Sequence, residues 1–148
     1  MLATTVGIKD MNQRSSERRP FGALVLILIH LAISTGHGWA HQAAMVRLTT
    51  FGYVYVYVVI TLMPLVAAAF LFTQKRKIGA LLLGLSMFGS FIFGFWYHFL
   101  SQTNDNVTQV PGPWHLIFLW TAIALAVIEL GGMIVGFRLF RGSSERAR

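Results

Sequence analysis

The sequence contains no cysteine and little charge, and both absences narrow the possible functions. Without thiols, the chain has no disulfide bridges, no thiolate metal ligands and no Cys-x-x-Cys redox chemistry. Only 11% of the 148 residues are charged and 55% are hydrophobic, whereas soluble domains carry about a quarter charged residues. So few charges cannot cover a water-facing surface. We therefore expect a lipid bilayer to surround much of the protein.

Sequence signatures of enzymatic chemistry are also missing. There is no nucleophile with a nearby base, no phosphate-binding loop and no catalytic pair of carboxylates. We therefore expect no catalytic activity from this chain on its own. In a soluble protein, the net charge of +7 would suggest nucleic acid. Here the basic residues cluster beside apolar segments, where anchoring at a membrane surface explains them, and we expect no nucleic-acid partner.

What the chain has instead is four long apolar segments of about 20 to 24 residues each. A helix needs ~20 residues to cross ~30 Å of hydrocarbon, and lipid forces helix because every backbone polar group must be paired internally. The sequence therefore predicts an all-α membrane protein with an antiparallel bundle of four transmembrane helices. The expected helices are residues 21–40, 50–72, 78–100 and 114–137, within a membrane domain of residues 20–140 that lies between basic tails at 1–19 and 141–148.

Three local features refine this prediction. Residues 1–19 show no helical period of apolar residues, so we expect a disordered or surface-lying tail, and Pro20 suits the first position of the first helix. The alternating stretch 53–57 (YVYVY) looks like a strand, but it lies inside a longer apolar run and is interpreted as helix in the interfacial aromatic belt. Pro64 predicts a kink in the second helix.

The distribution of Lys and Arg predicts the orientation. Eleven of the twelve basic residues lie in residues 1–19, in the loop at 74–77 and from Arg138 to the C-terminal end, and Arg47 alone lies on the opposite side. The positive-inside rule then places both termini in the cytoplasm. We expect an integral protein of a bacterial cytoplasmic (inner) membrane.

A cleaved signal peptide is the rival interpretation of the first segment. Arg18 and Arg19 precede the apolar run, and residues 38–40 (GWA) imitate a small-x-small cleavage site. Cleavage there would expose His41 as a new N-terminus able to bind copper. His30, in the middle of the apolar run, favours a transmembrane helix instead.

Ionisable residues inside the apolar segments are informative, because burying them in hydrocarbon is costly unless they are paired or hydrated. His30 and Glu129 lie at depths that differ by only ~3 Å at 1.5 Å per residue, so they can pair if the first and fourth helices touch. Ser34 shares the stripe of His30. These three residues can form a proton or ion relay, or a hydrogen-bonded contact that only fixes helix register.

The remaining histidines gather near the predicted outer surface. His37 and His41 have the i, i+4 spacing of two ligands to one metal. His98 ends the third helix, His115 begins the fourth, and Asp105 lies in the loop between them. This set predicts a copper, zinc or iron site, or the axial ligands of a b-type haem. Interfacial side chains without a ligand, or a pH-sensing group, are the alternatives.

Other patterns are less specific. The outer half of the third helix is aromatic on every side, as expected of an interfacial belt or of a pocket wall for a quinone or another flat ligand. Small residues spaced by four, in 86–94 and 132–136, allow close helix contacts. Asn106 begins an Asn-x-Thr glycosylation acceptor.

Together these features predict a small integral membrane subunit, or accessory protein, of a larger membrane complex. Its expected partners are the lipid bilayer and other membrane protein subunits, and its outer histidines are expected to bind a metal or haem. The alternative is a proton- or ion-conducting membrane protein that uses the intramembrane His/Glu relay.

Overall fold

Each of the four predicted apolar segments forms a helical span long enough to cross a membrane. The computed structural model describes the backbone of residues 3–145 and the side chains of residues 20–143. All regular secondary structure in that part of the chain is helical, as predicted. The candidate membrane spans are Pro20–Ala43, Thr50–Leu71, Arg76–Leu100 and Gly112–Ser143, with hydropathies of 1.7 to 2.3.

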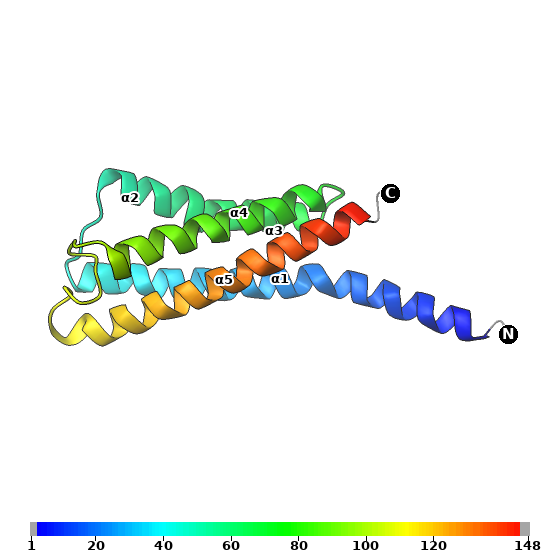
Figure 1. Cartoon of the computed structure of the whole chain (residues 1–148), viewed down its shortest axis with the longest axis horizontal. Coiled ribbons are helices and arrows are strands. Elements are labelled where there is room, and N and C mark those ends of the chain that lie inside the picture. The colour runs from blue at the N-terminus through cyan, green and yellow to red at the C-terminus, as the bar shows by residue number, and fades with distance from the viewer. Residues whose placement is uncertain (1–2, 146–148) are drawn as a thin grey trace.

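The spans run side by side, and the two termini lie at the same end of the bundle (Figure 1). We call the other end, which carries residues 44–49 and 101–111, the loop end. The helical elements in chain order are α1 (Ala3–Ala43), α2 (Thr50–Tyr55), the π-helix η1 (Val56–Leu62), α3 (Met63–Leu71), α4 (Arg76–Phe95), the π-helix η2 (Trp96–Leu100), the 3₁₀ helix η3 (Gly112–Trp114) and α5 (His115–Glu145).

The helices are not equally close along their lengths. α5 contacts both α1 and α4, and α4 also contacts α3. α1 contacts α3, but it makes few contacts with α2 and η1, which continue from α3 toward the loop end. The bundle is therefore closed near the termini and open between α1 and α2–η1 near the loop end.

Small residues close the half of the bundle near the termini. A methyl group on Gly79 would lie 2.7 Å from the backbone nitrogen of Leu71, and one on Gly136 would collide with the backbone of Gly84. Gly132 likewise lies against Met87. The predicted small-residue pattern at 132–136 is therefore confirmed as a close contact between α5 and α4, since a Cβ at either position would push the helices apart.

The structure differs from the sequence prediction at the first helix. α1 begins at Ala3, so the backbone of residues 3–19 is helical rather than irregular, and Pro20 lies inside the helix rather than at its start. Extending an existing helix requires no new nucleation, so a polar segment without an apolar period can still continue one.

The second span is helical through Tyr53 and Tyr57, which confirms the preference for helix over strand there. A kink was predicted at Pro64, and the helix changes its hydrogen bonding there. The π-helical stretch η1 ends at Leu62, two residues before the proline, and Pro64 lies in the first turn of α3, which continues directly from η1.

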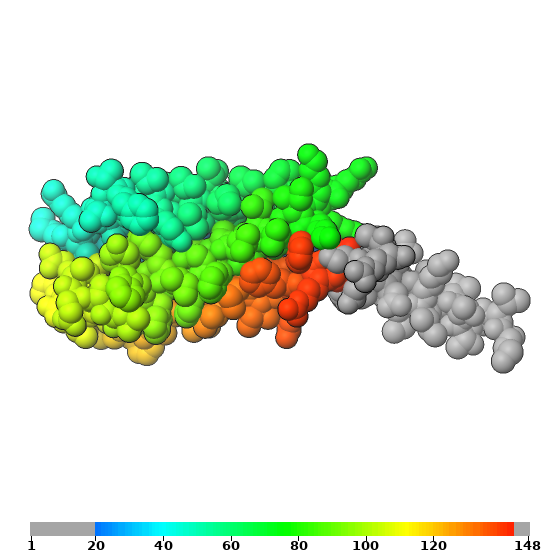
Figure 2. Space-filling view, turned by 45° about the horizontal axis from the view of Figure 1, so that its top comes forward, coloured from blue at the N-terminus to red at the C-terminus, as the bar shows by residue number. Residues whose placement is uncertain are grey.

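Large apolar side chains cover the outside of the bundle. Leu28, Leu62 and Val127 are between 53% and 66% exposed, although they lie in the middle of spans. Such a surface suits hydrocarbon and not water. The space-filling view shows residues near 100–113 (yellow-green) covering one end of the bundle (Figure 2). Most of the basic residues of the tails lie outside the described side chains, so the orientation in the membrane stays a prediction.

Candidate metal centre

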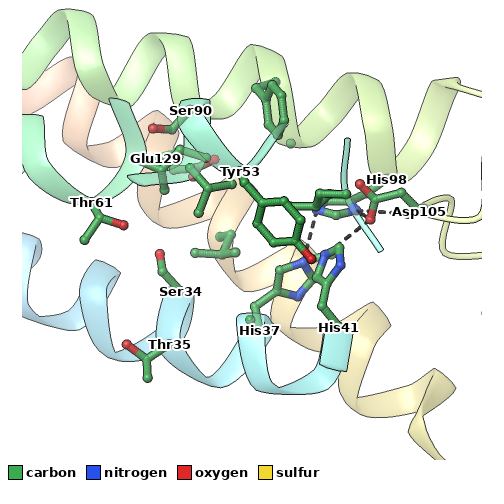
Figure 3. Close-up of a pocket in the computed structure, with 18 of the residues that line it drawn as sticks. Ser34, Thr35, His37, His41, Tyr53, Thr61, Ser90, His98, Asp105 and Glu129 are labelled. Atoms are coloured by element: carbon green, nitrogen blue, oxygen red, sulfur yellow. Dashed lines mark hydrogen bonds and ion pairs between the residues drawn. The ribbon is translucent and has the colours of Figure 1, made fainter. Parts of the chain in front are cut away.

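Three histidines from two helices meet inside the loop end of the bundle (Figure 3). His37 and His41 come from successive turns of α1, and His98 comes from η2. Their exposed fractions are only 6%, 9% and 7%. The i, i+4 spacing places the first two on one face of α1, opposite the third, so the predicted meeting of these three residues is found.

The rings are close enough to share one ion. The Nε2 atoms of His37 and His98 are 3.1 Å apart, and one ligand atom from each of the three histidines can be chosen so that all lie within 4.8 Å of one another. Two ligands of one tetrahedral ion with bonds of ~2.0–2.1 Å are roughly 3.3 Å apart. The distance between Nε2 of His37 and Nε2 of His98 therefore matches that of two ligands of one ion.

Each histidine is also held through its other ring nitrogen. The Nδ1 atom of His98 lies 3.0 Å from the backbone carbonyl oxygen of Asp105, and that of His41 lies 3.3 Å from the carbonyl of Val46. A carbonyl oxygen only accepts, so Nδ1 of His98 carries the proton, and its Nε2 atom presents a lone pair when the ring is neutral, as a metal ligand requires. The proton of a neutral His41 can face either the carbonyl of Val46 or Oδ1 of Asp105, which lies 3.2 Å from its Nε2 atom.

His37 is oriented in the same way by a hydroxyl group. Its Nδ1 atom lies 2.8 Å from Oγ1 of Thr121 on α5. That hydroxyl also lies 2.7 Å from the carbonyl of Ile117. If it donates there, it accepts from Nδ1 of His37 and the Nε2 atom of His37 is free of a proton; if it donates to Nδ1, the Nε2 atom carries the proton.

Asp105 adds a carboxylate to the cluster. Its Oδ1 atom lies 3.2 Å from Nε2 of His41 and 3.2 Å from Nδ1 of His98, and the residue is 5% exposed. Among the described residues, neither carboxylate oxygen has a partner with good hydrogen-bond geometry. A buried carboxylate is costly without a compensating positive charge.

The ring nitrogens inside the cluster need either a proton or a metal ion between them. Nε2 of His37 and Nε2 of His98, 3.1 Å apart, share a hydrogen bond only if one of them is protonated, and Nε2 of His41 faces the carboxylate of Asp105. A metal ion would replace these protons, because a ligating imidazole binds through an unprotonated nitrogen.

The turn after α1 positions His41. Met45 has φ +57°, and the backbone N–H of Val46 donates to the carbonyl of His41 at 2.9 Å. This is the bonding pattern of a helix C-terminal cap whose residue in the left-handed region is normally glycine. The turn brings the carbonyl of Val46 back over the His41 ring.

The loop at 101–111 positions Asp105 in a similar way. Asn106 donates from its side chain to the carbonyl of Ser101 at 2.7 Å and accepts from the backbone and hydroxyl of Thr108 at 3.0 and 2.8 Å. Val107 donates its backbone N–H to the carbonyl of His98 at 2.9 Å. Asn106, noted as a glycosylation acceptor, is 5% exposed and serves to fold this loop over the histidines.

Phe118 and Thr121 complete the site and were not predicted. Phe118 is fully buried, and its ring centroid lies 4.8, 4.7 and 5.4 Å from those of His37, His41 and His98. Both residues share the face of α5 that carries Glu129, since Thr121 and Phe118 lie eight and eleven residues before it, close to two and three helical turns. This helical period could have indicated from the sequence that both residues face the site, but it does not show which apolar residue contacts a histidine.

The structure separates His115 from the other histidines. Its Nδ1 atom lies 3.1 Å from the carbonyl of Val110, and it is not a member of the described group that can share an ion. The sequence predicted His115 at the same depth as the other histidines. Its side chain instead contacts the loop that precedes α5.

The predicted pair deeper in the bundle is present. Nε2 of His30 lies 3.4 Å from Oε1 of Glu129 and 3.4 Å from Oγ of Ser34. His30 is fully buried and Glu129 is 3% exposed. The condition for this pair was that the first and fourth spans touch, and α1 does contact α5.

These observations define the class of protein: four apolar helices able to span a membrane, with a buried group of His37, His41 and His98 that can bind a metal ion. Comparisons with protein-family models, curated proteins and solved structures find no significant match. The function is therefore argued from the site itself.

Proposed function

We propose that this chain is an integral membrane protein that binds one transition-metal ion at the loop end of its bundle. The observation that carries the proposal is the meeting of three buried imidazoles, from His37, His41 and His98, with one possible ligand atom of each within 4.8 Å of the others. The Nδ1 atoms of these rings lie against the hydroxyl of Thr121 and the carbonyls of Val46 and Asp105, which support their orientation. Asp105 supplies a negative charge beside them.

The donor set indicates which ions suit the site. Imidazole nitrogens together with a carboxylate oxygen are common ligands of zinc, copper(II) and iron, whereas calcium and magnesium prefer oxygen alone. Three histidines with a fourth, weaker or exchangeable ligand resemble the coordination of catalytic rather than structural zinc. We therefore expect zinc or copper with a position open to an exogenous ligand.

A single ion suits the geometry better than the b-type haem that the sequence left open. Axial ligands of a haem lie on opposite faces of the macrocycle, so the two rings are separated by its plane. Here the rings of His37 and His98 are in contact, with centroids 4.7 Å apart.

Metal analysis of the purified protein tests the proposal. In detergent or nanodiscs, the wild-type chain is expected to hold about one zinc or copper ion per chain, and His98→Gln is expected to lose it. His115→Gln is the matched control, because it removes a histidine from the same end of the bundle but outside the cluster. A metal-free wild-type protein that also fails to bind added zinc or copper would overturn the proposal.

A second candidate function is proton transfer through the bundle, supported by the contact between His30 and Glu129. Ser34 extends this contact toward the histidine cluster along α1. Proton flux into liposomes distinguishes it from a purely structural pair. Flux that is lost in Glu129→Gln favours the relay, whereas equal flux in the two proteins removes it.

We also propose that the chain associates with other membrane protein subunits, as the sequence analysis expects. The connections between spans are short, so a partner would contact the apolar outside or the loop end of the bundle. Copurification from native membranes after mild solubilisation tests this: a chain that migrates alone and retains its metal would argue against a subunit role.

A further inference from the structure

A cavity of about 470 Å³ lies beside the histidine cluster and extends along the inside of the bundle to Glu129. Its walls come from α1 on one side and from α2 and η1 on the other, with α4 and α5 behind. Ser34, Thr61 and Ser90 line it in addition to the histidines. A cavity of this size and mixed lining is typical of a small-molecule site.

Two residues that line the cavity are well exposed. Trp39 on α1 and Tyr57 on η1 have exposed fractions of 57% and 66%, so the cavity is open beside them. Both lie within candidate spans, and α1 makes few contacts with η1 here. A ligand can therefore reach the cavity sideways from the hydrocarbon, without crossing the loop end.

The walls combine aromatic surfaces with hydrogen-bond acceptors. Tyr53, Tyr57 and Phe93 provide flat faces. Glu129 contacts His30 through Oε1, and among the described residues its Oε2 atom accepts no hydrogen bond. An acyl chain would leave this oxygen unpaired, whereas a ring that carries hydroxyl groups would both stack on the aromatic faces and donate to it.

Gly94 keeps the two ends of the cavity connected. A methyl group at this position would lie 3.8 Å from Cδ2 of His98 and 3.9 Å from Oε2 of Glu129. These are ordinary van der Waals distances, so the missing side chain leaves space between the histidine cluster and the carboxylate and does not relieve a clash. A larger residue here would fill the cavity without removing any proposed metal ligand.

We infer that this cavity binds a lipid-soluble hydroquinone, which enters from the bilayer between α1 and η1 and donates a hydroxyl hydrogen bond to Glu129. Its ring would then lie next to the proposed metal centre. The inference adds a ligand class to the proposed metal site. Only a role of the metal ion beside the bound ring rests on the proposed function. Binding itself follows from the cavity, its opening and its acceptors.

Saturable binding of a radiolabelled decyl hydroquinone tests the inference. The protein is held in lipid nanodiscs without oxygen, and empty nanodiscs measure partition into lipid. We expect one saturable site per chain. The dimethyl ether of the same compound keeps the ring and tail but donates no hydrogen bond, so it is expected to bind about tenfold more weakly.

Two glycine variants provide the structural control. Gly94→Leu fills the cavity and is expected to weaken binding by at least about tenfold, whereas Gly131→Leu, at a position with nothing within 4 Å, is expected to bind like the wild type. If Gly94→Leu does not fold, the smaller Gly94→Ala replaces it and should show a weaker effect in the same direction.

The outcomes separate this inference from the metal proposal. Absence of saturable binding, equal binding of the dimethyl ether, or unchanged binding in a folded Gly94→Leu would overturn the hydroquinone site. Metal content is measured on the same samples. Hydroquinone binding by a chain that takes up no metal would overturn only the metal proposal, and metal without hydroquinone binding would overturn only this one.

Discussion

The two halves of the bundle differ in how closely the same helices pack against one another. Near the termini, glycines and alanines bring backbones into contact, and the core of Ala67, Ala80, Leu83 and Met87 is closed. Near the loop end, the helices separate, and histidines, Asp105 and a cavity occupy the space. The contrast teaches that close contact in one half holds the helices together while the other half keeps room for ligands.

Removing Asp105 is expected to have the largest effect on the open half. Asp105→Ala deletes the carboxylate that lies 3.2 Å from both His41 and His98, so metal affinity should fall by more than about 100-fold. Asn104→Ala, an exposed neighbour in the same loop, is the control. Titration with zinc against a competing chelator measures the difference, and equal affinity in both variants would exclude Asp105 from the site.

Thr121→Val should have a smaller effect on the same half. The substitution keeps the shape of the side chain but leaves Nδ1 of His37 without its hydrogen-bond partner, and such supporting hydrogen bonds are worth about 10- to 100-fold in metal affinity. Thr35→Val is the matched control, because its hydroxyl bonds only to the carbonyl of Leu31 on the exposed side of α1. The same chelator titration applies, and an unchanged affinity would show that His37 needs no orientation from α5.

Gly136→Ala tests the closed half. A methyl group there would collide with the backbone of Gly84, so we expect a loss of about 1–3 kcal/mol in the free energy of unfolding. Gly131→Ala, which meets nothing within 4 Å, should be neutral or slightly stabilising because alanine favours helix. Unfolding in mixed micelles measures both. Equal stability of the two variants would mean that α4 and α5 are not held this closely.

The smallest expected effect concerns the pair that lies between the two halves. Hydrogen bonds between membrane helices contribute about 0.6 kcal/mol on average, so Glu129→Gln should change stability by only about that amount. The same unfolding measurement checks this prediction, with Ser143→Ala, a hydroxyl near the end of α5, as the control. A loss of several kcal/mol would mean that His30 and Glu129 fix the helix register rather than serve transport or ligand binding.

Much of the candidate site followed from spacing alone. The i, i+4 pair His37 and His41, and the position of His98 at a span end, were sufficient to predict that these residues meet, because in an up-and-down bundle the first and third spans run in the same direction and end at one level. His115 satisfied the same reasoning and lies elsewhere, since depth does not determine the direction in which a side chain points. Thr121 had no chemical signature at all, because a threonine in an apolar helix most often bonds to its own backbone.

The sequence by itself determined the spans, because length and hydropathy decide what can lie in lipid, and it determined that buried histidines and Glu129 would need partners. Only the tertiary structure decided which partners these are. Where the helices touch depends on glycines such as Gly136 that admit a backbone, and where they separate depends on the absence of such contacts between α1 and η1. These contacts depend on the shapes of two helix surfaces together, whereas a sequence pattern describes each helix separately.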